Sequence, residues 1–203
     1  MSEVHFETAK NSELIFTLAG RHLCSSVQPS REAQQWISYH QSLWENCQTV
    51  IVLGLGCGYH VRALKMATDA NILVLDSSRA VIEAALRVHP LDFRDSDIIF
   101  WDSVQNLSFS KPLIAATKNA YAVLIHEPSA FENPDLFLTT KAFLLGRKAE
   151  GLRWLFQNRG LPIPEFIDGT EINMTTLDGV WHRQLAGNEH SQPVMQALRE
   201  LIA

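Results

Sequence analysis

The chain has 203 residues, of which 46% are hydrophobic and 19% charged, a composition that suits a folded core and excludes the disordered class. Its formal net charge of −5 argues against nucleic acid as the main partner, because a phosphate backbone is bound by a basic face. No stretch reaches the roughly 18 consecutive apolar residues of a membrane span. Residues 1–7 lack the basic start and apolar run of a secretory signal. We therefore expect a cytoplasmic protein with no nucleic-acid or membrane partner.

The first part of the chain predicts a strand, a helix and a buried strand. The apolar run Leu14–Leu18 is typical of a short strand, and Gly20 ends it. Pro29 and Ser30 predict the start of a helix, with Ser30 as the N-cap. The residues expected on the buried stripe of this helix are Ala33, Trp36, Ile37, His40, Leu43 and Trp44. The continuous β-branched run Thr49–Leu53 indicates a parallel strand that is covered on both faces.

Strands and helices continue to alternate after this point. Three further strands are predicted at 72–75, 97–101 and 121–125. Helices are predicted from about Tyr59, from Ser77 or Ser78 to His89, and over 134–158. The tail contains Asp-Gly turn signals at 168–169 and 178–179, which favour a hairpin, and a terminal helix is predicted over 194–202.

This alternation determines the expected fold class. Strands separated by helices need crossover connections and a mostly parallel sheet. We therefore predict an α/β fold with a Rossmann-like, mostly parallel sheet and helices on both faces. A short β-rich extension over 1–28, an α/β core over 29–160 and a β-hairpin-containing tail over 161–203 are expected to form a single domain, 1–203.

The turn after the first buried strand is the strongest candidate for a ligand site. Gly54, Gly56 and Gly58 alternate there with Leu55 and Cys57, directly before a helix. Glycines let the backbone approach a ligand closely, and the helix N-terminus offers free N–H groups to an anion. In a doubly wound sheet, ligands bind beyond the carboxyl ends of the strands. The turn therefore predicts a nucleotide-type ligand site, although the same glycines would also serve a tight turn with close helix packing.

Five further residues at the same sheet edge are candidates for ligand contact. Asp76 ends the second strand of the core, where a ribose is usually held, and it is equally suited to capping the next helix. Asp102 ends the third strand and either receives a base amine or faces solvent. His60 is placed to touch a phosphate or to pack. His126 and Glu127 end the fourth strand and form either a proton-transfer pair or a loop anchor.

No established catalytic pattern occurs. The sequence has no G-x-S-x-G nucleophile elbow, no P-loop lysine and no metal-ligand cluster. The cysteines Cys24, Cys47 and Cys57 have neither a C-x-x-C nor a zinc-type spacing, which indicates reduced thiols. The catalytic residues, and whether there are any, stay open at this point.

Residues 52–58, followed by Asp76, resemble motif I and its acidic partner in class I methyltransferases that use S-adenosylmethionine. Gly54 occupies the position where those enzymes usually have Asp or Glu, and His60 replaces their last glycine. Residues 126–129 lack the Asn/Asp-Pro-Pro-aromatic motif of the amino methyltransferases. A divergent methyltransferase with S-adenosylmethionine as cofactor is the alternative that this resemblance implies.

A second resemblance covers roughly residues 14–130. The stretch Gly54-Leu55-Gly56-Cys57-Gly58-Tyr59-His60 resembles the Gly-Leu-Gly-x-Gly-Tyr-His signature in the N-terminal Rossmann-like region of motility-associated factor (Maf) proteins. Pro29–Ala33 resembles that family's Asp-Pro-x-x-Glu-Ala helix entry, with Gln28 in place of Asp. Maf proteins are linked to flagellin glycosylation with nonulosonic acids, and the transferase chemistry is attributed to a separate central domain whose Gly-x-Gly-Pro-Ser turn does not occur here.

This resemblance implies a Maf-N-like Rossmann module that binds a nucleotide or a nucleotide-activated sugar. It also implies a possible protein partner in flagellin or surface glycosylation. An interaction module whose glycines are purely structural is the third possibility.

Overall fold

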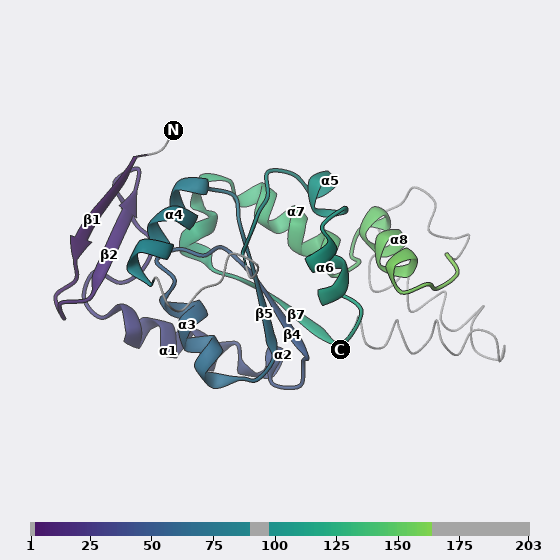
Figure 1. The fold of residues 1–203 in the computed structure, drawn as a ribbon, viewed down its shortest axis with the longest axis horizontal. Coiled ribbons are helices and arrows are strands. Elements are labelled where there is room, and N and C mark those ends of the chain that lie inside the picture. The colour runs from purple at the N-terminus through teal and green to yellow at the C-terminus, as the bar shows by residue number, and fades with distance from the viewer. Residues whose placement is uncertain (1–2, 90–97, 164–203) are drawn as a thin grey trace. The chain divides into compact units, whose positions relative to one another are not determined.

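The computed structural model describes residues 3–89 and 98–163 (Figure 1). The chain divides into two compact units, Met1–Phe137 and Leu138–Ala203, and the boundary falls within one helix. The predicted hairpin and terminal helix of the tail lie outside the described residues. The single-domain assignment over 1–203 stays a prediction.

The centre of the first unit is a sheet of four parallel strands, β4 (Thr49–Leu53), β5 (Asn71–Asp76), β6 (Ile98–Phe100) and β7 (Tyr121–Ile125). Their order is β6-β5-β4-β7. Leu53 is in register with Leu75 on one side and with Ile125 on the other, so the carboxyl ends of three strands meet at one edge. This sheet, flanked by helices, confirms the predicted Rossmann-like α/β class.

Helices connect and cover these strands. They are α1 (Pro29–Tyr39), α2 (Gln41–Trp44), α3 (Tyr59–Ala67), α4 (Arg79–Val88), α5 (Val104–Leu107), α6 (Lys111–Ala116) and the 3₁₀ helix η2 (Glu127–Glu132). Helices α3, α4 and α6 contact β5, and α1 packs on α3. The strand β4 is buried at all five positions, as its continuous apolar run predicted.

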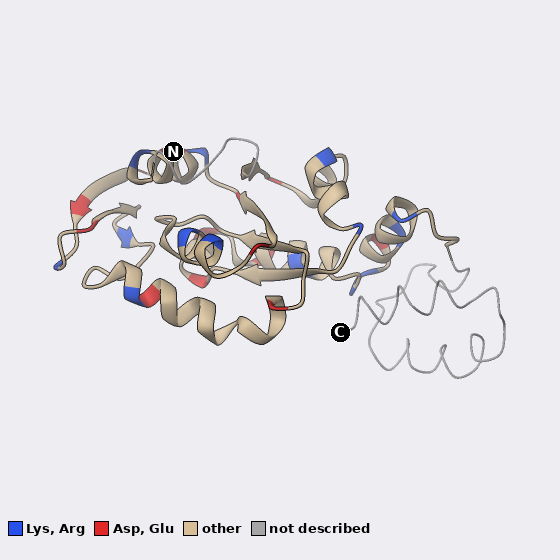
Figure 2. Ribbon diagram, turned by 60° about the horizontal axis from the view of Figure 1, so that its bottom comes forward, with Lys and Arg blue, Asp and Glu red and all other residues tan. Residues whose placement is uncertain are grey.

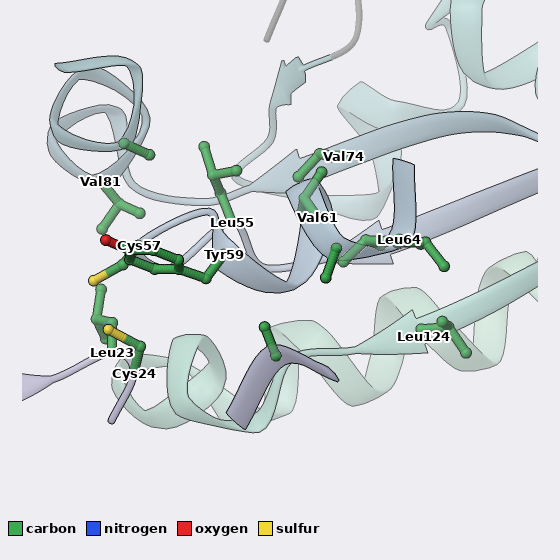
Figure 3. Packing of buried hydrophobic residues seen from close by; sticks show 14 of the residues in the cluster. Leu23, Cys24, Leu55, Cys57, Tyr59, Val61, Leu64, Val74, Val81 and Leu124 are labelled. Atoms are coloured by element: carbon green, nitrogen blue, oxygen red, sulfur yellow. The ribbon is translucent and has the colours of Figure 1, made fainter. Parts of the chain in front are cut away.

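The N-terminal extension is a small antiparallel sheet of β1 (Val4–Thr8), β2 (Leu14–Leu18) and β3 (Arg21–His22). It packs on α4 and shares the core of the main sheet. Leu23 lies in one apolar cluster with Leu55, Val61 and Val74, and Figure 3 shows these residues converging from the extension, the glycine turn, α3 and β5. The extension is therefore an integral part of the first unit.

The start of α1 differs from the prediction. Pro29 is the first helical residue and Gln28 is the N-cap, so the assignment of Ser30 as N-cap is wrong. The hydroxyl of Ser30 instead donates to the Glu13 carboxylate, which also accepts the Ser30 N–H. Proline suits the first helical position because its missing N–H would have no partner there. The helix also ends at Tyr39 rather than running on to Trp44, which lies in α2.

The predicted helix over 134–158 is two helices, α7 (Pro134–Leu144) and α8 (Ala149–Asn158). Gly146 has φ of 64°, and its N–H donates to Phe143 while the N–H of Arg147 donates to Ala142. This pair of bonds is a Schellman motif, which ends a helix at a left-handed glycine. In the second unit Phe143 and Trp154 then pack with ring centroids 5.2 Å apart.

Within the described residues, none of the helices has the length and apolar character required to cross a membrane. Acidic and basic residues are interspersed along the described elements (Figure 2).

Candidate functional site

The glycine turn is closed by the protein itself. Every residue from Leu53 to His60 is buried, and the three glycines have φ of 100°, 47° and 86°. A Cβ at Gly54 would lie 2.5 Å from the Ser129 Cβ, and one at Gly56 would lie 2.7 Å from the His126 ring. The glycines therefore let the segment after β7 approach the turn, and His126 occupies the space above Gly56.

Asp76 supports this turn from the second strand. Its carboxylate accepts the N–H of Leu55 at 2.7 Å and the N–H of Ser78 at 2.9 Å. Asp76 therefore links the glycine turn to the residues directly before α4. The side chain of Ser78 is the N-cap of that helix. Burial raises the pKa of Asp76 to about 6, and the backbone N–H donors act in the opposite direction. Both carboxylate oxygens are thus engaged within the chain.

Beside the turn, two buried imidazoles are stacked. The rings of His60 and His126 are 3.8 Å apart at an angle of 6°. His60 Nε2 bonds the Gly54 carbonyl at 3.0 Å, and His126 Nδ1 bonds the Ser129 hydroxyl at 2.7 Å. Burial lowers the pKa of His60 to about 4. Burial, together with repulsion from His60 when that ring is protonated, holds the pKa of His126 well below its usual value. Both rings are therefore neutral at pH 7.

The histidine stack forms one wall of a pocket of about 210 Å³. Trp36 of α1 meets both rings nearly edge-on, at 5.1 Å from His60 and 6.3 Å from His126. The residues that line this pocket are Cys24, Pro29, Glu32, Ala33, Trp36, Tyr59, His60, His126, Glu127 and Pro128. We refer to it as the histidine pocket.

The histidine pocket lies at the point where the connections of the sheet diverge. Its lining comes from α1, from the start of α3 after β4, and from the segment after β7. From β4 the chain crosses over to β5 on one side, while β7 pairs with β4 on the other. Open α/β sheets bind ligands at such a switch point, beyond the carboxyl ends of the strands.

Cys24 is the only thiol among the lining residues, and it is not activated as a nucleophile. A hydrogen bond with Cys57, together with burial, raises its pKa strongly, so the thiol stays protonated. Cys57 in turn contacts the Phe16 carbonyl at 3.4 Å, and Figure 3 shows both cysteines in the apolar cluster. Among the described residues, no group of three or more His, Cys, Asp or Glu is arranged to hold a metal.

The structure brings together only part of the predicted site. His60, His126 and Glu127 line the histidine pocket, whereas Asp76 lies under the turn. Asp102 is exposed, and its carboxylate accepts a bond from the Asn106 side chain at 2.5 Å. The turn residues Gly54, Leu55, Gly56, Cys57 and Gly58 are buried and do not line the pocket. As a ligand-contact set, these residues remain a prediction.

Sequence reasoning missed the contribution of α1. Trp36 was predicted only as part of the buried stripe of this helix, and Glu32 was placed only in the helix entry at 29–33. Nothing in their spacing indicates that they line a pocket with the two histidines. Tyr59 was predicted as the start of a helix and as part of the glycine signature, but not as a pocket residue. Its hydroxyl donates to the Leu14 carbonyl at 2.8 Å.

The chain matches no family model, and comparisons with curated proteins and with solved structures give no match. The fold alone therefore assigns the class of protein, which is a Rossmann-like α/β domain.

The buried histidines predict that the protein loses stability in acid. A buried histidine with a lowered pKa leaves the folded state at full stability when the pH is above 6.5, the ordinary pKa of the side chain. As the pH falls below 6.5, the unfolded chain takes up a proton that the folded chain does not, so the fold loses stability. Between pH 7 and 5 we expect His60 to remove roughly 2 kcal/mol from the free energy of unfolding, and His126, whose pKa is also lowered, to act in the same direction. Asp76 has a raised pKa, so its contribution to the free energy of unfolding increases as the pH falls. It offsets about 1 kcal/mol of the loss.

Urea unfolding at a series of pH values measures this slope. The variant His60→Gln keeps a donor for the Gly54 carbonyl and does not titrate, so we expect it to remove the roughly 2 kcal/mol that His60 contributes to the loss in acid. An equal slope in the variant and the parent would contradict the assignment of His60 as a buried neutral imidazole.

Proposed function

We propose that this chain is a Rossmann-like binding module that holds a nucleotide or nucleotide-activated sugar at the histidine pocket. One observation carries the proposal: the pocket lies at the switch point between β4 and β7, where this class of sheet binds its ligands. Its lining combines an aromatic wall from Trp36 with a few polar groups, which is the usual make-up of small-molecule sites.

Binding is favoured over methyl transfer by the state of the glycine turn. A methyltransferase would need an open crevice above Gly56 and an acidic side chain free to hold a ribose. Here His126 covers Gly56, and both oxygens of Asp76 accept backbone N–H bonds. These contacts argue against an adenosyl cofactor in the position that the methyltransferase resemblance implies.

The Maf resemblance of residues 54–60 extends the proposal to a cellular role. A module of this kind would be accessory to flagellin or surface glycosylation, and a glycosylation enzyme would be its protein partner. Catalysis would then belong to that partner.

Calorimetric titration of the purified chain tests the proposal. The panel contains S-adenosylmethionine, S-adenosylhomocysteine, NAD, and uridine and cytidine nucleotides with their sugar conjugates. We expect micromolar binding of a uridine or cytidine compound and none of the adenosyl compounds. Binding should be lost in Trp36→Ala and kept in Tyr39→Ala, because Tyr39 lies on the same helix, is 83% exposed and does not line the pocket. Binding of an adenosyl compound alone would favour the methyltransferase alternative.

A further inference from the structure

We propose that the histidine pocket holds the terminal sugar of a nucleotide-activated sugar, a hydroxyl-bearing ring without a carboxylate, and leaves the nucleoside and its phosphates outside. This inference rests on the proposed function and specifies the part of the ligand that enters.

The size of the histidine pocket limits its occupant. Its volume of about 210 Å³ is below the roughly 300–1,000 Å³ of pockets that enclose a drug-sized molecule. A complete nucleotide-activated sugar has a nucleobase, a ribose and a second sugar, with phosphate between the two sugars. Only one of its rings therefore enters.

Several hydrogen-bonding groups of the lining are acceptors. The Tyr59 hydroxyl donates to the Leu14 carbonyl, so its proton is not free for a ligand. His60 donates through Nε2, because the Gly54 carbonyl has no proton to give. In a neutral imidazole the other nitrogen is then an acceptor, so His60 Nδ1 needs a donor. Trp36 Nε1 has no partner among the described residues, but it lies below the accessible surface.

The charges of the lining are negative. Glu32 and Glu127 line the pocket, and none of the lining residues is a lysine or arginine. One oxygen of Glu32 accepts the Ser25 N–H at 2.6 Å, and Glu127 is exposed at the rim. Carboxylates bind hydroxyl and amine donors and repel phosphate or carboxylate groups. The lining therefore fits a neutral or amino sugar and opposes an acidic one.

The aromatic rings favour a sugar over a nucleobase. A planar base is bound by stacking between parallel aromatic faces. Here the two imidazoles stack on each other, 3.8 Å apart, so neither inner face is open. Trp36 stands at 70° to His60 and therefore does not form a parallel plate with it. A puckered ring whose hydroxyls point toward acceptors fits this arrangement.

Titration calorimetry of the intact chain with five probes tests the inference. The probes are uridine, UDP, UDP-glucose, UDP-N-acetylglucosamine and CMP-N-acetylneuraminate, whose sugar carries a carboxylate. We expect a neutral UDP-sugar to bind at least about tenfold more tightly than UDP, since each charge-assisted hydrogen bond to a hydroxyl contributes on this scale. Glu127→Gln should lower the affinity for the UDP-sugar by about tenfold and leave the affinity for UDP unchanged. Glu132→Gln, on the same 3₁₀ helix but outside the lining, is the matched control.

The outcomes separate the two proposals. If UDP binds as tightly as its sugar conjugates, or if the carboxylate-bearing sugar is preferred, the sugar-ring inference is overturned while the binding function stands. If none of the five probes and no other panel compound binds, both proposals are overturned. Weaker binding of the UDP-sugar to Glu127→Gln with an unchanged Glu132→Gln supports the acceptor role of Glu127.

Discussion

Replacing Gly54 with alanine is expected to lower the free energy of unfolding by about 4 kcal/mol, because backbone strain and overpacking act together at this position. Its φ of 100° is a backbone conformation that L-residues with a side chain rarely adopt. The new Cβ would also lie 2.5 Å from the Ser129 Cβ and 2.9 Å from its hydroxyl. Ser129 holds His126 through a hydrogen bond, so relief of the clash would disturb the histidine stack.

Gly20→Ala is the matched control for this change. Gly20 also has a positive φ, of 75°, but nothing lies within 4 Å of a Cβ there. We therefore expect only the strain component, about 1 kcal/mol. Urea unfolding followed by circular dichroism measures both variants. Equal losses in the two proteins would show that the close approach to Ser129 has no energetic weight.

Gly151→Ala is expected to have a similarly large effect in the second unit. Gly151 lies in α8, and a Cβ there would be 2.1 Å from the Phe143 carbonyl oxygen and 2.8 Å from the Phe143 Cα. These atoms belong to the backbone of α7, so they cannot rotate away and the two helices must separate. We expect a loss of about 3 kcal/mol or more from overpacking.

Hydrogen exchange in peptides from α7 and α8 measures this local effect. The amides of 140–158 should exchange faster in Gly151→Ala than in the parent. Gly160→Ala is the control, because a Cβ at Gly160 has open space around it despite its φ of 66°. Parent-like protection in Gly151→Ala would contradict the close packing of the two helices.

The main sheet was predictable because its strands have strong local signals. Residues 49–53 and 121–125 are continuous apolar runs, and the strands β4 and β7 have these bounds. The break at Gly146 was missed because the apolar pattern continues across it, and a single glycine is tolerated in many helices. The short helices α5 and α6 were missed because four to six residues show too little periodicity.

The site was only partly predictable. The sequence placed His60 and His126 at the ends of strands, but the strand order that puts β7 beside β4 depends on tertiary packing. Without that order, nothing indicates that the two imidazoles stack or that Trp36 closes the pocket. The glycines were read as space for a ligand, whereas at Gly54 and Gly56 that space admits Ser129 and His126 of the chain itself.

We propose that the histidine pocket, and not the glycine turn, receives the ligand. Hydrogen exchange with the tightest-binding compound of the calorimetric panel tests it most directly. We expect slower exchange in Pro29–Tyr39 and Glu127–Glu132, two of the segments that line the pocket, with no change at the start of α4 beside Asp76. Protection centred on residues 78–82, or no protection with any panel compound, would contradict it.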